Sequence, residues 1–278
     1  MGKFFDEIPS FLVPWIKQQK IFFVASAALS EKGHVNVSPK GFEGTFHIVD
    51  SKTVWYEDMS GSGIETTAHL KENGRMTIMF VAFEGPPRIT RLFGYGKVYE
   101  FDSPEYNSLI PLEKRQPGSR SIIKLDIHKV GTSCGYSIPF FDFKCDRMKL
   151  HGMAAQKESQ DIKAASCFDE SDPSNEVEDG QVLPPLPENG LKGYWRAHNA
   201  KSIDGLTGLE SAYKSHTVFK PFNTDWKKDD ERVKADKIVR ILPDAVMQWI
   251  DPKVVFAFCL GVFISGSWAN ILAAVGTK

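Results

Sequence analysis

The chain contains 278 residues, of which 42% are hydrophobic and 25% are charged, as expected of a folded soluble protein. Its formal net charge of −1 gives no electrostatic support for nucleic-acid binding. The four cysteines have no Cys-x-x-Cys spacing, and the first 20 residues contain acids and a proline where a signal peptide needs an apolar run. We therefore expect a cytoplasmic protein in a reducing compartment.

Residues 21–134 have the pattern of a series of short strands, rich in β-branched and aromatic residues and separated by glycine. The connections are too short for crossover helices, so we expect antiparallel pairing. A helix over 62–73, which Asn73-Gly74 ends, and a second helix that begins at Ser103-Pro104 interrupt the series. This predicts a mainly β fold, a small antiparallel barrel with short helices. The predicted strands are 21–29, 34–40, 45–50, 53–58, 75–83, 88–101 and 119–133.

The composition changes after residue 152, where the predicted barrel ends. We expect a helix over 153–166, and then a stretch from Phe168 to Asn189 that holds seven acids, four prolines and no bases. Such a stretch cannot bury enough apolar surface to order itself, so 153–191 is predicted to be a helix followed by a disordered linker. Aromatic residues return in 192–222, which we expect to pack back onto the barrel.

The last part of the chain, 223–278, combines a basic stretch with an apolar one. Residues 254–275 carry no charge, and as a helix they would span about 33 Å, enough to cross a hydrocarbon core of about 30 Å. The bases that precede them predict a cytosolic side and a tail anchor in an intracellular membrane. The alternative is a buried C-terminal helix, which Ser265, Ser267 and Asn270 favour because they oppose insertion. The bases are Lys227, Lys228, Arg232, Lys234, Lys237, Arg240 and Lys253.

A loop of glycines and hydroxyls, Ser60-Gly61-Ser62-Gly63, lies between a predicted strand and the 62–73 helix. Two interpretations of this loop stay open. Ser62 and Glu65 fit the S-x-x-E capping box, in which each side chain bonds to the backbone of the other. Alternatively, the amides of Gly61 to Ile64 form a cradle for a phosphate at the positive end of the helix dipole.

Basic residues on the neighbouring strands are candidates to assist such a cradle. Ser38 and Lys40 share one face of their strand because strand side chains alternate, and together they would supply a hydroxyl and a charge. Arg91 lies in the middle of a strand, where burial would require a partner or an anionic ligand. The alternative for each is a solvated surface side chain. The histidines and cysteines have no ligand spacing, so we expect no metal site.

Four stretches in order resemble the fungal and bacterial branch of the pyridoxamine 5′-phosphate oxidase-related family. They are HVNVSPKGFEGTFHIVD, VWYEDMSGSGIETTAHLKENGR, FEGPPRITRLFGYGKVYE and NAKSIDGLTGL. The resemblance implies an FMN-binding split barrel and a homodimer with FMN across its interface. The implied cofactor-binding residues are Val35, Asn36, Ser38, Lys40, Tyr56, Asp58, Ser60, Gly61, Ser62, Gly63, Thr66, Thr67, Arg88 and Arg91. Arg115, Gln116 and Arg120, in a turn without an obvious role within one subunit, are candidates to complete the site of the second subunit.

Two departures from the family pattern bear on function. The Arg-Lys pair that the family carries at the start of this helix is replaced by Thr66 and Thr67, and the C-terminal signature that recognises the pyridoxine ring has no equivalent. We therefore expect negligible pyridoxamine phosphate oxidase activity. The resemblance implies an FMN-dependent oxidoreductase of unknown substrate, for which the sequence nominates no catalytic residue. The alternatives are a non-catalytic flavin-binding protein and a haem-binding split barrel, which needs an axial ligand.

Overall fold

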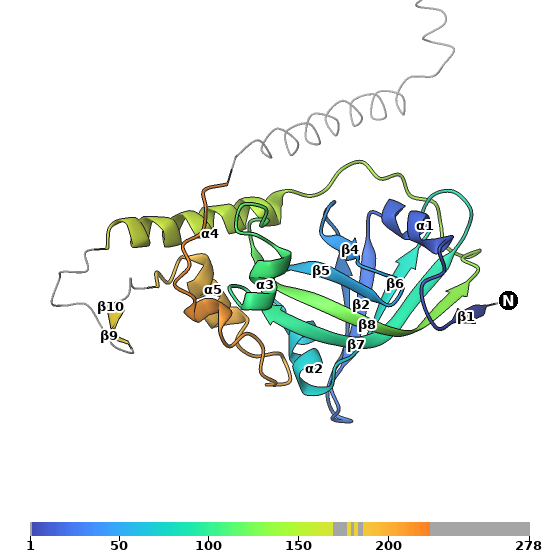
Figure 1. Cartoon of the computed structure of the whole chain (residues 1–278), viewed down its shortest axis with the longest axis horizontal. Coiled ribbons are helices and arrows are strands. Elements are labelled where there is room, and N and C mark those ends of the chain that lie inside the picture. Colours follow the sequence, from blue (N-terminus) through green and yellow to red (C-terminus); the bar gives the residue numbers. More distant parts are fainter. Residues whose placement is uncertain (1, 169–176, 179–180, 183–185, 223–278) are drawn as a thin grey trace, which may run out of the picture. The chain divides into compact units, whose positions relative to one another are not determined.

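The computed structural model describes residues 2–168, 177–178, 181–182 and 186–222 (Figure 1). The chain divides into two units, Met1–Trp226 and Lys227–Lys278, and all of these residues lie in the first. No helix among them is long and apolar enough to cross a membrane, and the predicted 254–275 helix lies outside them.

The central feature is one antiparallel sheet in the order β3-β2-β6-β7-β8-β5-β4, with β1 added along β8. This confirms the mainly β, antiparallel split-barrel fold. Its strands are β1 (Lys3–Phe5), β2 (Phe22–Ala27), β3 (Val35–Lys40), β4 (Phe46–Ile48), β5 (Thr53–Met59), β6 (Arg75–Val81), β7 (Ile89–Glu100) and β8 (Ser119–Ser133). The predicted strands agree with β2 to β8 within two residues at each end, and β1 was not predicted.

The sheet curls until its two ends meet. β3 stands at one end of the strand order and β5 near the other, yet the Lys40 Nζ atom on β3 lies 2.8 Å from the Asp58 carboxylate on β5. Alternation of side chains places Val24, Ile78, Leu92 and other apolar residues inside, where they form the barrel core. The seam between β3 and β5 is therefore closed by side chains rather than by a backbone ladder.

Helices cover the ends of the barrel. They are α1 (Leu12–Gln18), α2 (Glu65–Asn73), α3 (Pro104–Leu109), α4 (Lys149–Ser166) and α5 (Leu191–His198), with a 3₁₀ turn η1 (Ala212–Lys214). Figure 1 shows α4 and α5 grouped away from β1, at the far end of the barrel. Two residue pairs of the predicted linker form the short ladder of β9 (Val177–Glu178) and β10 (Gln181–Val182).

The C-terminal segment 186–222 packs against the outside of the barrel. Trp195 and Phe219 join Phe101 and Tyr106 in a second hydrophobic cluster. The Asp161 carboxylate accepts hydrogen bonds from the first amides of α5, at 2.6 Å from Leu191 N, and thereby fixes that helix to α4.

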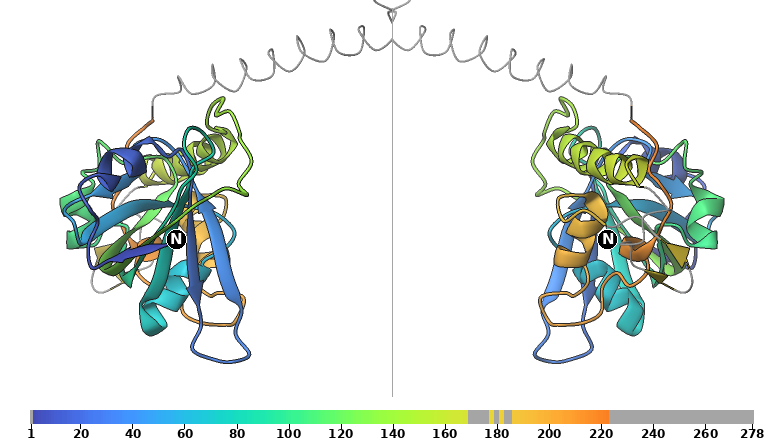
Figure 2. Two further views of the ribbon diagram at one scale, coloured as in Figure 1. Left: turned by 90° about the vertical axis from the view of Figure 1, so that its right-hand side faces the viewer. Right: turned by 90° about the vertical axis from the view of Figure 1, so that its left-hand side faces the viewer.

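This segment also reaches the far end of the β2–β3 hairpin. Figure 2 shows the hairpin (blue) extending beyond the sheet, with the C-terminal segment (orange) beside its turn. There Asp204 accepts from the His34 backbone at 2.8 Å and contacts the His34 ring at 2.6 Å. One segment thus connects α4, the barrel and the hairpin.

Candidate anion-binding site

The loop before α2 carries a row of backbone donors. The first hydrogen bond of the helix runs from Ala68 N to Ile64 O at 3.0 Å, and the amides of residues 61–67 donate to no acceptor within the part of the chain that the structure describes. Unpaired amides at a helix N-terminus, with the positive end of the helix dipole, attract anions. The phosphate-cradle interpretation therefore has its donors in place.

The capping-box interpretation is wrong. The helix begins at Glu65 rather than at Ser62, its N-cap is Ile64, and no side chain caps it. Ser62 lies two residues before that N-cap and is exposed, so it is not in the position from which a serine bonds to the third amide of a helix. The Glu65 carboxylate instead accepts a long bond of 3.4 Å from Ile203 N.

A buried charge cluster lies beside the loop. Asp58 is fully buried, with one carboxylate oxygen 2.8 Å from Lys40 Nζ and the other 2.8 Å from Arg120 Nε. Burial by itself would raise the pKa of Asp58, but Arg120 and Lys40 outweigh it and lower that pKa to about 2. Two cations and one anion leave this cluster with a single positive charge.

A chain of polar side chains ties α2 to strands β2 and β3. Asn36 Nδ2 donates to Thr66 Oγ1 at 3.0 Å and lies 3.4 Å from Ser26 Oγ, which in turn lies 3.0 Å from His69 Nδ1. Burial lowers the pKa of His69, which favours the neutral form of the ring. This chain fixes the first turn of α2 against the hairpin.

Two buried hydroxyls at this end of the barrel, those of Tyr56 and Thr67, have no partner among the described residues. Buried polar atoms in native proteins nearly always meet a partner, which includes water or a ligand. The free amides, the exposed Ser62 hydroxyl and Lys40 are further donors at this end of the barrel, and the chemistry of all these groups fits a phosphate.

Some predicted residues do not reach this place. Val35 and Arg91 project from the outer face of the sheet, where Arg91 Nη1 lies 3.4 Å from Ser133 Oγ. The Cζ atom of Arg88 lies 5.3 Å from the centre of the Trp15 ring. The alternation that turns Asn36, Ser38 and Lys40 inward turns Val35 outward.

Arg115, Gln116 and Arg120 have clear roles within their own chain, so the premise that made them candidates for a second subunit's site is wrong. Arg115 pairs with the buried Glu158 at 2.8 Å. Gln116 N donates to the Glu57 carboxylate at 3.0 Å, and Arg120 belongs to the Asp58 cluster. Arg115 and Gln116 lie in the turn before β8, which contacts of α4 and β5 hold in place, and Arg120 lies in β8 itself.

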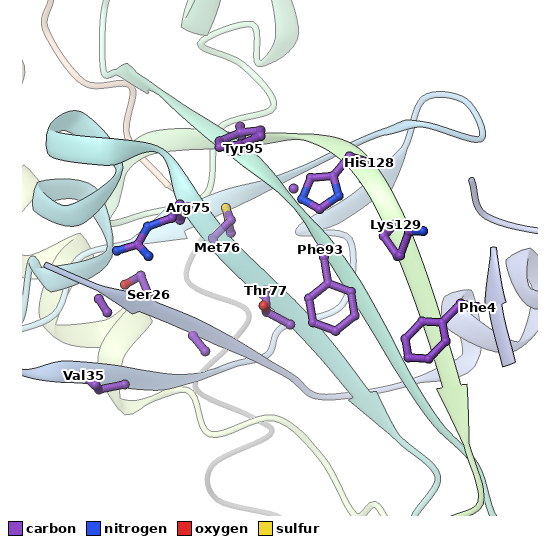
Figure 3. Close-up of a pocket in the computed structure, with 13 residues that line it drawn as sticks. Phe4, Ser26, Val35, Arg75, Met76, Thr77, Phe93, Tyr95, His128 and Lys129 are labelled. Atoms are coloured by element: carbon purple, nitrogen blue, oxygen red, sulfur yellow. The ribbon is translucent and has the colours of Figure 1, made fainter. Parts of the chain in front are cut away.

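The outer face of the sheet has a cleft of about 570 Å³ that the sequence analysis did not identify (Figure 3). Aromatic and basic side chains from four strands surround it, and none of the described residues that line it is acidic. The alternation along β7 predicts that Phe93 and Tyr95 share one face of that strand. The cleft itself could not be predicted without the order of the neighbouring strands in the sheet. The lining includes Phe4, Val35, Arg75, Thr77, Phe93, Tyr95, His128 and Lys129.

Comparison with known proteins gives the family. The family profile for pyridoxamine 5′-phosphate oxidase matches residues 8–134. The pyridoxamine 5′-phosphate oxidase family protein ustO of Aspergillus flavus is 34% identical over 260 residues, which cover 90% of this chain and 97% of the relative.

Solved structures are similar over less of the chain. HupZ from Group A Streptococcus is 20% identical over 44% of this chain and 91% of its own, with a TM-score of 0.37. An FMN-binding protein from Syntrophomonas wolfei is 11% identical over 43% and 81%, with a TM-score of 0.33. The sequence match over nearly the full length does decide the family: the chain belongs to the pyridoxamine 5′-phosphate oxidase family.

Proposed function

We propose that this protein binds FMN, with the phosphate at the start of α2, and that it is an oxidoreductase acting on a small molecule. The observation that carries the proposal is the row of unpartnered amides at residues 61–67 next to the positively charged Lys40–Asp58–Arg120 cluster. Membership of a family named for a phosphate-containing substrate supports the same chemistry.

The chain's own residues would have the following roles. The amides of residues 61–64, the Ser62 and Thr67 hydroxyls and Lys40 would hold the phosphate. Bound FMN would supply the electron transfer. Because Thr66 and Thr67 replace the family's cationic pair, affinity would rest on hydrogen bonds more than on charge. We assign no side chain the role of general acid or base. We propose that the protein oxidises pyridoxamine phosphate negligibly, which an assay of peroxide release checks.

The double variant Lys40→Ala/Ser62→Ala is expected to bind FMN more weakly by about 2–4 kcal/mol, since it removes one charge and one hydroxyl. Quenching of FMN fluorescence on titration with protein measures this. The matched control is Lys97→Ala/Ser108→Ala, two exposed positions on β7 and α3. If the first variant retains flavin as the wild type does, the phosphate does not lie here.

We also propose that the outer face of the sheet is covered by a second copy of the chain. Phe4, Val35, Val37 and Tyr95 are more than half exposed on it, and apolar patches of this kind mark contact surfaces. The variant Val37→Glu should then sediment as a monomer in ultracentrifugation, whereas a wild-type monomer would contradict the proposal.

A second candidate function is haem binding at the outer cleft. The specific observation is that His128, Arg75 and Lys129 line the same aromatic cleft, so one imidazole and two cations stand near a surface suited to a planar anion. An absorption spectrum of the purified protein decides between flavin bands and a Soret band. A Soret band that survives His128→Ala would exclude this histidine as the ligand.

We propose that the apolar 254–275 segment anchors the protein in an intracellular membrane, on sequence grounds alone. Full-length protein is expected in the membrane pellet after cell fractionation, and a variant that ends at residue 222 in the soluble fraction. A variant with Leu260 and Ile264 both changed to lysine serves as a control of equal length. Full-length protein found wholly in the soluble fraction would remove the anchor.

A further inference from the structure

We infer that Asn199, which is distant in sequence but in contact with the loop before α2, is a positioning residue for the anion site. It fixes the Gly61 carbonyl so that the Ser62 amide faces the ligand. The inference rests on the proposed function, because it names which residue shapes that site. Asn199 follows α5 directly and belongs to the stretch NAKSIDGLTGL.

The contact itself is direct. Asn199 Nδ2 donates to the Gly61 carbonyl at 2.9 Å, and Arg120 Nη1 donates to the same oxygen at 3.3 Å. A trans peptide is planar, so its carbonyl and its amide point in opposite directions. With the Gly61 carbonyl held toward buried Asn199 and Arg120, the Ser62 N–H points to the opposite, solvent side, where Ser62 itself is exposed.

A second contact from the same helix holds the preceding residue. Trp195 Nε1 donates to Ser60 Oγ at 2.6 Å, and Ser60 N donates to Gly118 O at 2.6 Å. Trp195 and Asn199 are four residues apart, the spacing that brings side chains to one face of a helix. This face of α5 therefore holds two consecutive residues of the loop, Ser60 and Gly61.

Asn199 is rigid enough to act in this way. Its side chain is fully buried, its N donates to Trp195 O at 2.8 Å, and its O accepts from Leu209 N at 2.8 Å. A Cβ on Gly208 would clash with the Asn199 carbonyl oxygen, so the close approach of these two chain segments requires glycine. Without this support a glycine-rich loop would lose the defined direction of its amides.

The test compares FMN with riboflavin, which lacks the phosphate. Asn199→Asp keeps the size of the side chain but cannot donate to the Gly61 carbonyl in its charged form. We expect it to weaken FMN binding at least about tenfold and to leave riboflavin binding unchanged, so that the preference for FMN over riboflavin falls. Asn107→Asp, on the exposed side of α3, adds the same charge elsewhere and is expected to keep the wild-type preference.

Asn199→Ala removes the donor without adding a charge and should lower the preference in the same direction, which separates positioning from repulsion. Near-UV circular dichroism identifies a variant that has lost its fold. The FMN preference of the other variant then decides whether Asn199 has this role. If both variants prefer FMN over riboflavin as strongly as the wild type does, the role of Asn199 is overturned, but the proposed phosphate site is not. A wild type that binds FMN no better than riboflavin would overturn the proposed phosphate site, and this inference with it.

Discussion

Replacing Asp58 with alanine is expected to lower the free energy of unfolding by about 3–5 kcal/mol, because it leaves the buried Arg120 guanidinium without its counter-charge. The Arg120 side chain is only 4% exposed. Lys40 loses the same partner but has more access to water. Urea denaturation measures the loss. Asp126→Ala is the matched control, since this half-exposed aspartate also pairs with two lysines, Lys97 and Lys124, and surface pairs contribute about 0–1 kcal/mol. Equal losses in the two variants would contradict a special role for Asp58.

The same carboxylate gives the fold a definite response to acid. Folding lowers the pKa of Asp58 from 3.8 to about 2, so it stabilises the native state above pH 4, and this contribution is lost as the pH falls toward 2. The shift corresponds to about 2 kcal/mol. Asp58→Asn has no such titration, so its stability should change less than that of the wild type over this interval.

Trp195→Ala is expected to cost about 3–5 kcal/mol of folding free energy, since it empties the largest fully buried side chain from the second cluster. It also removes the donor to Ser60 Oγ. Thermal and urea denaturation measure the cost.

Two further variants separate packing from hydrogen bonding at this position. Trp195→Phe keeps much of the apolar volume and should recover most of the lost stability, while Arg196→Ala, one residue along and exposed, should change little. If Trp195→Ala were no more costly than Arg196→Ala, α5 would not be part of the folded core.

The strands could be predicted because their signal is local. The alternation of β2, β6 and β7 and the glycine-rich connections are visible in a window of ten residues. β1 has only three residues, and what makes it a strand is its pairing with residues 130–132 of β8, which no local window contains. The motif match at Ser62 left a capping box and a phosphate cradle both open, and the structure excludes the cap because α2 begins only at Glu65.

The supports of the candidate site were not predictable for the same reason. Asn199 and Trp195 contact Gly61 and Ser60 across more than 130 residues of chain, and Glu158 reaches Arg115 from α4. A buried arginine in a turn looks like a surface residue until its partner is known. The family pattern also implied cofactor contacts for Arg88 and Arg91, whereas Arg88 lies against the Trp15 ring and Arg91 projects from the outer face of the sheet.

The pairing of β1 with the end of β8 has a consequence for how the protein is made. Phe4 pairs with Gly131, so β1 has no strand partner until more than 120 further residues have been synthesised. The second cluster needs Phe219 as well. Such long sequence separations slow folding, because loop closure must precede the contacts that reward it. During synthesis β1 and the partners of Phe219 therefore stay without their native contacts until late, and apolar surface exposed in this interval favours aggregation.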